Sequence, residues 1–171
     1  MATETRSPGD VARSVFAAVS NHNLDVIHEL VPPDGVDDFV AIGEFRGPDA
    51  IRGFFAELLA AFPDFTLTID RIVSDESTAV VQWHAAGAFT GGAFQGIHPT
   101  GRRVEVRGVD VMEISGGRVQ RNTIYYDGAS FARQIGMLPR QDSPADRAML
   151  AAFNARTRVT TQVKTMRERR K

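Results

Sequence analysis

The feature that most constrains the fold is a run of alternating polar and apolar positions between residues 65 and 126. Alternation with a period of two places one face of a strand against a core and the other face toward solvent. Short turn sequences rich in Gly, Asp, Ser and Thr separate the alternating stretches, so consecutive strands are expected to pair as antiparallel hairpins. We predict strands at residues 65–73, 78–89, 103–114 and 118–126.

The residues that precede this run follow helical spacing instead. Ser7 and Pro8 suit the N-cap and first position of a helix, and apolar residues then recur every three to four positions. A Gly-Pro-Asp sequence at 47–49 begins a further amphipathic stretch, which Pro63 ends. Three helices followed by hairpins predict an α+β fold with the helices on one face of the sheet. Shorter elements are expected at 24–31 (helix), 36–45 (a short strand pair or an irregular strand) and 128–135 (helix).

Composition limits the partners of the chain. A length of 171 residues suits one domain, and the absence of cysteine excludes disulfides and thiolate chemistry. Residues 156–171 carry seven of the 20 Lys and Arg but one of the 21 Asp and Glu, so the rest of the chain is acidic. Nucleic-acid binding needs a basic face on the fold itself, and none is predicted. No apolar run could span a bilayer and no secretory signal is visible, so we expect a cytoplasmic protein without a membrane partner.

The sequence contains no motif for a metal or a cofactor, and neither is expected. The four histidines are scattered, and no two of them form a helical pair with a carboxylate between. No Gly-rich phosphate loop precedes a helix, and no Gly-x-Ser-x-Gly elbow is present. Any chemistry would therefore rely on acids, histidine, phenol and a dry pocket.

Asp110 is the strongest candidate for a catalytic group. It shares one strand face with Val106 and Met112, and a carboxylate among apolar neighbours costs free energy unless it is paired. Desolvation there should raise its pKa above the usual value of about 3.9, as a general acid or base requires. The structural alternative is an aspartate hydrogen-bonded to a neighbouring strand or paired with an arginine, and both interpretations stay open.

Three further polar residues are candidates, each with a structural alternative. Tyr125 could donate to an oxyanion from the pocket wall, or be a core aromatic with its hydroxyl at the rim. His84 and Trp83 lie on opposite faces of one strand, and either face could line the pocket. Asp127 could act in the pocket, or be the N-cap of the last short helix and accept the N–H of Ser130.

Several motifs resemble, in order and spacing, those of the SnoaL-like polyketide cyclases. These motifs are the Trp-His pair at 83–84, the Pro-Thr-Gly-Arg hairpin at 99–102 and the Gln-Ile-Gly-Met-Leu-Pro ending at 134–139. The family belongs to the group shaped like nuclear transport factor 2 and ketosteroid isomerase, and the resemblance covers residues 8–139. It implies an α+β cone, in which a curved, mostly antiparallel sheet and three N-terminal helices surround a deep apolar pocket.

The resemblance also bears on domain organisation and assembly. We expect a domain at residues 1–139, followed by a helical extension at 140–171 that packs on the domain or on a partner subunit. A basic arm that touches acidic partners or membrane is the alternative for the extension. Because the family commonly dimerises through the outer sheet face, we expect a homodimer that uses Val109 and Val111. The apolar side of the extension would consist of Met149, Leu150, Phe153, Val159, Val163 and Met166.

The acid–base residues that the resemblance implies are altered in this chain. Asp127 matches an acidic position of the family. The family's catalytic acid lies three residues earlier, where this chain has Ile124, and a family histidine on the preceding strand falls at Asp110. The residues that the family uses for its best-known reaction, an aldol cyclisation, are therefore changed in this chain.

We expect a cofactor-independent enzyme that shifts a proton or closes a ring in a small, largely apolar carbonyl or polycyclic compound. Asp110 would be the base, and Tyr125 or His84 would polarise an oxygen. Epoxide hydrolysis in the same pocket, and non-catalytic binding of a hydrophobic ligand, are the alternatives. The predicted lining of the pocket is Phe16, Phe39, Phe54, Phe55, Leu58, Trp83, Phe94, Met112 and Phe131.

Overall fold

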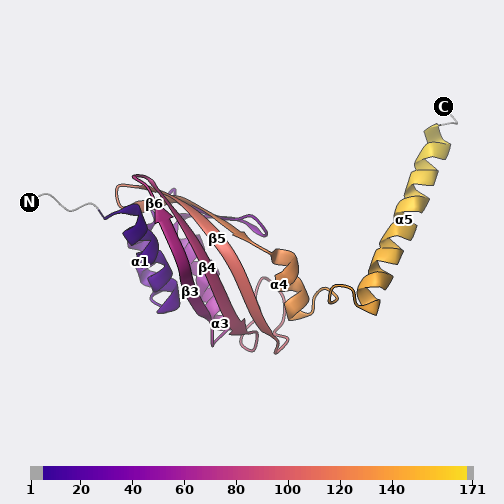
Figure 1. Cartoon of the computed structure of the whole chain (residues 1–171), viewed down its shortest axis with the longest axis horizontal. Coiled ribbons are helices and arrows are strands. Elements are labelled where there is room, and N and C mark those ends of the chain that lie inside the picture. Colours follow the sequence, from indigo (N-terminus) through magenta and orange to yellow (C-terminus); the bar gives the residue numbers. More distant parts are fainter. Residues whose placement is uncertain (1–5, 169–171) are drawn as a thin grey trace, which may run out of the picture.

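This computed structural model describes residues 6–168. In that part of the chain a six-stranded sheet has the order β2-β1-β6-β5-β4-β3, and helices cover one of its faces (Figure 1). The strands are β1 (Val36–Phe39), β2 (Gly43–Arg46), β3 (Thr66–Ser74), β4 (Thr78–Ala88), β5 (Arg103–Ser115) and β6 (Arg118–Tyr126). The helices are α1 (Pro8–Ser20), the 3-10 helix η1 (Leu24–Val26), α2 (Ile27–Leu30), α3 (Gly47–Ala61), α4 (Gly128–Ile135) and α5 (Pro144–Glu168).

The alternating segments form the sheet that they predict. Each long strand begins and ends within one residue of its expected range. Of the two alternatives for residues 36–45, the structure shows the short strand pair, formed by β1 and β2. Neighbouring strands are antiparallel except β1 and β6, which run parallel and make the sheet mixed. No tight turn joins β1 to β6, so hairpin geometry does not set their relative direction.

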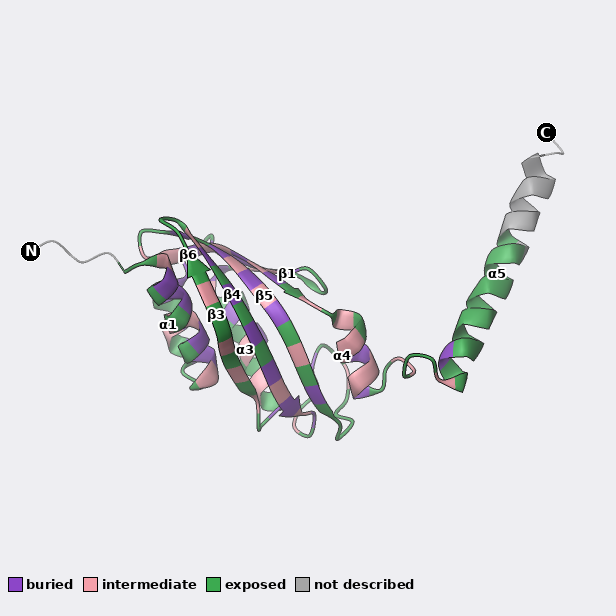
Figure 2. Cartoon of the chain, viewed as in Figure 1, coloured by how far each residue is buried: buried purple, intermediate pink, exposed green. Residues whose placement is uncertain are grey.

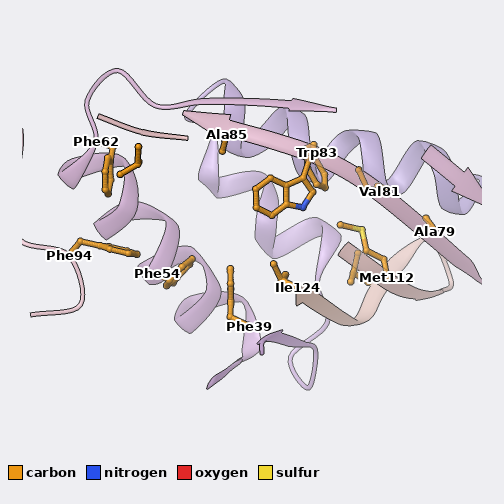
Figure 3. Packing of buried hydrophobic residues seen from close by; sticks show 14 of the residues in the cluster. Phe39, Phe54, Phe62, Ala79, Val81, Trp83, Ala85, Phe94, Met112 and Ile124 are labelled. Atoms are coloured by element: carbon orange, nitrogen blue, oxygen red, sulfur yellow. The ribbon is translucent and has the colours of Figure 1, made fainter. Parts of the chain in front are cut away.

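The core lies between the sheet and helices α1 and α3. Along β4 buried residues alternate with exposed ones, which Figure 2 shows as purple and green bands. The buried set packs with Val11 and Phe16 of α1 and Phe54 of α3 in one apolar cluster. In Figure 3, Trp83 of β4 and Phe39 of β1 lie around the same interior space as Phe54. The N-terminal helices therefore cover the same face of the sheet, as predicted.

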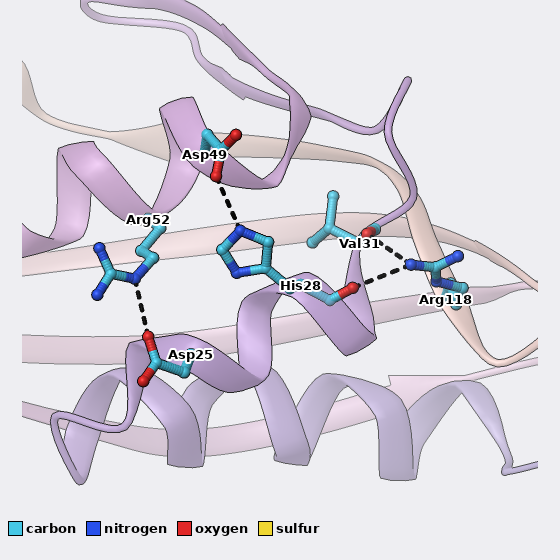
Figure 4. Close-up of polar contacts among 6 residues, drawn as sticks. All are labelled: Asp25, His28, Val31, Asp49, Arg52 and Arg118. Atoms are coloured by element: carbon cyan, nitrogen blue, oxygen red, sulfur yellow. Dashed lines mark hydrogen bonds and ion pairs between the residues drawn. The ribbon is translucent and has the colours of Figure 1, made fainter.

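Polar contacts at the surface hold the short helices in place (Figure 4). His28 Nε2 contacts Asp49 Oδ1 at 2.8 Å, and Arg52 Nε donates to Asp25 Oδ1 at 3.0 Å, which joins α3 to α2 and η1. The Arg118 guanidinium of β6 donates to carbonyl oxygens at the end of α2, including that of His28 at 3.0 Å. These carbonyls have no partner inside the helix, so Arg118 satisfies groups that a helix end leaves free.

Helix α5 projects away from the sheet and its covering helices in Figure 1. The backbone N–H of Asp146 in its first turn donates to the hydroxyl of Ser143 at 3.1 Å. Met149, Leu150 and Phe153 of the predicted apolar side are exposed. The side chains of Val159, Val163 and Met166 lie outside those that the structure describes. Within the described part of the chain, no helix combines the length and apolar character needed to cross a membrane.

Candidate functional site

A cavity of about 120 Å³ lies between the inner face of the sheet and helices α1 and α3. Its wall is mostly apolar and rich in aromatic rings. Ring centroids of Phe39 and Phe54 are 4.4 Å apart, those of Phe54 and Phe94 are 5.7 Å apart, and those of Phe94 and Phe131 are 6.3 Å apart. Eight of the nine predicted lining residues are on this wall: Phe16, Phe39, Phe54, Phe55, Leu58, Trp83, Phe94 and Phe131.

Met112 is the predicted lining residue that the structure places elsewhere. Met112 is two positions after Asp110 on β5, so it faces inward on the same side of the strand, but it does not line the cavity. It is fully buried in the apolar cluster, one inward position further along β5, where core side chains fill the space. The prediction that Met112 lines the pocket is therefore wrong, because alternation gives the face of a strand and not the depth along it.

Asp110 stands on the cavity wall, 6% exposed, among mostly apolar neighbours. Its Oδ1 accepts the indole N–H of Trp83 at 2.7 Å, and its Oδ2 accepts the amide N–H of Asn122 at 2.9 Å. Burial raises the pKa of Asp110 to about 6, although the two hydrogen bonds act in the opposite direction. Among the described residues no arginine pairs with it. The arginine pair is therefore not found among the described residues. Asp110 is both a desolvated carboxyl and an aspartate hydrogen-bonded to its two neighbouring strands, so the structure contains features of both interpretations.

Gly108 makes the contact between Trp83 and Asp110 possible. It is the register partner of Trp83 in the β4–β5 pair, two residues before Asp110 on the inward face. A Cβ atom at this position would lie 2.2 Å from a ring carbon of Trp83. The indole therefore lies flat over the glycine, where any side chain would displace it.

Asp37 and Asn122 complete a buried polar group that sequence reasoning missed. Asp37 is 5% exposed and Asn122 is 3% exposed, and the two are register partners in the parallel β1–β6 pair. Burial, followed by the nearby charge of Asp110, raises the pKa of Asp37 to about 8, while a hydrogen bond with the Asn122 side chain lowers it. The signal was present in β1, since Asp37 shares a face with Phe39, a residue predicted to line the pocket.

Tyr125 is on the outer face of β6, with 50% of its surface exposed. Its predicted place on the pocket wall is therefore wrong. The inward positions of β6 are Asn122, Ile124 and Tyr126, and all three line the cavity. Tyr126 therefore lines the cavity in the place predicted for Tyr125, and burial raises the pKa of its phenol.

His84 and Asp127 also lie away from the cavity wall. Trp83 takes the inward position, so His84 faces outward, where its Nδ1 contacts Asp70 Oδ1 at 2.7 Å. Asp127 is the N-cap of α4, and its Oδ1 accepts the N–H of Ser130 at 2.8 Å. The capping interpretation of Asp127 is confirmed. The cavity instead combines Asp110 with Asn122 and Tyr126.

Ile124, at the position of the family acid, is buried on the cavity wall. It is the register partner of Asp110 in the β5–β6 pair. Among the described residues, the carboxyl group on the cavity wall therefore comes from β5, next to the position where the resemblance implies one on β6.

A curved mixed sheet with helices on one face and an apolar cavity between them defines the nuclear transport factor 2-like class of fold. Residues 9–135 match the model of the SnoaL-like polyketide cyclase family, and the chain belongs to this family. No curated protein sequence matches the chain significantly.

Solved structures with this fold are similar to the chain at low identity. A protein from Jannaschia sp. CCS1 described as a SnoaL-like polyketide cyclase shares 23% identity at a TM-score of 0.67, over 78% of this chain and 98% of its own. IdmH from Streptomyces antibioticus, described as a polyketide cyclase, shares 24% identity at a TM-score of 0.65. The match covers 77% of this chain and 99% of IdmH. AclR from Streptomyces galilaeus, described as a hydroxylase, shares 23% identity at a TM-score of 0.66. The match covers 90% of this chain and 94% of AclR. Identities this low show the fold alone.

Proposed function

We propose that this chain is a cofactor-independent enzyme that transfers a proton within a small, largely apolar carbonyl or polycyclic compound. The observation that carries the proposal is Asp110, a buried carboxyl on the wall of an aromatic cavity, oriented by two donors and with its pKa raised to about 6. Such a group is a stronger base than an ordinary aspartate and is still mostly ionised at pH 7. Membership in a family of polyketide cyclases supports an enzymatic role.

In the proposed reaction Asp110 removes a proton from the carbon next to a carbonyl group. The C–H bond breaks, the proton passes to the carboxylate, and the electron pair moves onto the carbonyl oxygen as an enolate. Tyr126 is the proposed donor to this oxygen, because it lines the cavity and its raised pKa keeps the hydroxyl protonated. Return of the proton to another carbon isomerises the compound. Alternatively, the enolate carbon attacks a second carbonyl and closes a ring, the electron pair of that carbonyl moves onto its oxygen, and the proton passes from Asp110 to this alkoxide.

The size and surface of the cavity indicate the shape of the substrate. An apolar cavity of about 150 Å³ binds benzene, so about 120 Å³ accommodates roughly one ring. Aromatic side chains with offset or edge contacts favour a flat apolar ligand. We therefore infer that one ring of the substrate, bearing the oxygen, enters toward Asp110 while the rest extends toward the mouth of the cavity.

Asn122 favours hydrolysis of an epoxide as a second candidate reaction. Asn122 and Asp110 are hydrogen-bonded neighbours on the wall, and a cavity water within reach of both would be oriented for attack with Asp110 as its base. Binding of a hydrophobic ligand without catalysis is a third candidate. It is supported by Ile124, which leaves the family's acid position without a titratable group.

Exchange of the acidic α-protons of 2-tetralone in D₂O, followed by ¹H NMR, tests the proposal. We expect the wild-type chain to accelerate exchange and Asp110→Asn to reduce that acceleration by at least about 100-fold, the usual size of a general-base contribution. Tyr126→Phe should also slow exchange. The matched variant Tyr125→Phe should not, because that hydroxyl is on the outer face.

Two results would replace the proposal. Ligand-induced shifts of cavity resonances with exchange no faster than in buffer would indicate a binding protein. Hydrolysis of indene oxide without tetralone exchange would favour the epoxide reaction.

A further inference from the structure

The buried amide of Asn122 has one hydrogen-bonding atom in use and one free. Its Nδ2 donates to Asp110 Oδ2 at 2.9 Å. Its Oδ1 is buried and accepts no hydrogen bond from a residue that the structure describes. A buried acceptor without a donor costs free energy, so a native protein is expected to supply one.

Asp37 is the residue placed to supply it. It lies opposite Asn122 in the β1–β6 register, and both side chains are buried on the inward face of the sheet. A hydrogen bond donated by an N–H of the Asn122 amide stabilises the ionised form of Asp37, which is why this neighbour lowers the pKa of Asp37. An ionised carboxylate is only an acceptor, whereas a protonated carboxyl is also a donor. Asp37 can therefore satisfy Asn122 Oδ1 only in its protonated form.

The charges around Asp37 also favour the protonated form. Asp110 is the charged group that acts on it, and two buried carboxylates without a counter-charge cannot both ionise cheaply. The adjacent Asp38 faces outward and pairs with Arg121 at 2.5 Å, so this arginine lies on the other side of the sheet. Charged residues on the elements that pack against β1 contact other partners: Glu44, Arg46, Asp49, Arg52, Glu57, Arg118 and Arg121.

We propose that Asp37 is a positioning residue, whose protonated carboxyl donates to Asn122 Oδ1 and holds the amide with its NH₂ group toward Asp110. An asparagine amide can rotate by half a turn with little change in shape, which would present Oδ1 to Asp110 instead. The Asp37 donor removes that choice. It thereby makes Asp110 the carboxylate of the pair that carries the charge.

This arrangement separates the roles of two similar carboxyls by their surroundings. Asp110 receives two donors and faces the cavity, whereas Asp37 lies outside the cavity wall and adds its own proton to the network. The orientation of Asn122 and the charge states rest on the strand register, the burial and the raised pKa of Asp37, and not on any reaction. The consequence for catalysis rests on the proposed function of Asp110.

Carbon-detected NMR titration of the aspartate carboxyl groups tests the proposal without a substrate. In the wild type we expect Asp110 to ionise first and Asp37 to remain protonated at pH 7, with one slowly exchanging pair of Asn122 side-chain N–H signals. In Asp37→Asn the carboxyl titration at higher pH, which belongs to Asp37, disappears. The Asp110 titration and the Asn122 side-chain signals persist, because the amide introduced at position 37 can still donate a hydrogen bond to Asn122 Oδ1. In Asp37→Leu the donor is lost, so the pKa of Asp110 should rise by at least about half a pH unit.

Asp38→Asn is the matched control, since it changes the neighbouring carboxyl on the outer face and should leave the Asp110 titration unchanged. Ionisation of Asp37 below about pH 5 in the wild type would overturn the proposal. An Asp37→Leu variant in which the pKa of Asp110 is the same as in the wild type would also overturn the proposal. If Asp37→Leu does not fold, the wild-type and Asp37→Asn titrations still decide. If the titrations give the expected results but the protein does not accelerate 2-tetralone exchange, the proposed function is wrong. In that case the proposed hydrogen bonds among Asp37, Asn122 and Asp110 are still supported.

Discussion

Trp83 Nε1 donates to Asp110 Oδ1 at 2.7 Å across neighbouring strands, and the indole occupies space that Gly108 leaves open. Gly108, Trp83 and Asp110 thus form one structural unit. The glycine admits the ring, the ring orients the carboxylate, and the carboxylate faces the cavity. This unit explains why a charged residue is tolerated in an apolar strand face.

Gly108→Ala should destabilise the protein by about 1–3 kcal/mol, the usual cost of overpacking a core. The added Cβ would lie 2.2 Å from the Trp83 ring, so the indole must move and its bond to Asp110 weakens. Urea denaturation measures the loss. Gly53→Ala is the control: that position lies inside α3 with open space around it, so the change should be neutral or stabilising. Equal effects of the two variants would refute this account of Gly108.

Asp110→Asn should lower stability by only about 1–2 kcal/mol at pH 7. The amide accepts one of the two hydrogen bonds and meets the other donor with an N–H, but it also removes a buried charge. Thermal or urea unfolding gives the value. A loss well beyond this range would make Asp110 a residue that holds the fold together, and would remove the main support for its role as a base.

The pH dependence of stability should differ between the wild type and Asp37→Asn. Folding raises the pKa of Asp37 to about 8 and that of Asp110 to about 6, so the folded state binds more protons than the unfolded state. Stability from these groups is therefore full below about pH 4 and falls as pH rises toward 8.

Asp37→Asn should remove the larger part of the loss of stability with rising pH, because Asp37 has the larger pKa shift. The variant should be more stable than the wild type by at least about 1 kcal/mol at pH 8, since one pH unit of pKa shift corresponds to about 1.4 kcal/mol. The advantage should shrink steadily toward pH 4. Urea denaturation midpoints across this range measure the difference, and a gap that is constant with pH would contradict the raised pKa of Asp37.

We propose that the outer sheet face forms a homodimer. Val109, Val111, Val80 and Tyr125 are neighbours there by strand register, and the last two are exposed in the single chain. Sedimentation equilibrium should show a dimer at micromolar concentration, which Val111→Lys dissociates. Val40→Lys, in the exposed β1–β2 turn, is the control and should remain dimeric. A wild-type monomer at these concentrations would remove the proposal.

Much of the fold follows from local patterns in the chain. The period of two located the long strands, Ser7 and Asp127 marked helix starts through their caps, and the aromatic face of α3 indicated the cavity wall. Asp110 stood out because a carboxylate in an apolar strand face contradicts its surroundings. Such features depend on neighbours within a few residues, so the sequence shows them directly.

The remainder of the site depends on which strands meet and which face turns inward. Alternation could not choose between Trp83 and His84, and it placed Tyr125 where Tyr126 lies, because both faces of these strands carry mixed residues. Asp37 became important only through the parallel pairing of β1 with β6, which joins segments 85 residues apart in register. The sequence by itself determined the elements and gave four catalytic candidates, of which Asp110 lines the cavity. The tertiary structure decided the partners of that candidate, because strand register and burial are set by contacts between distant parts of the chain.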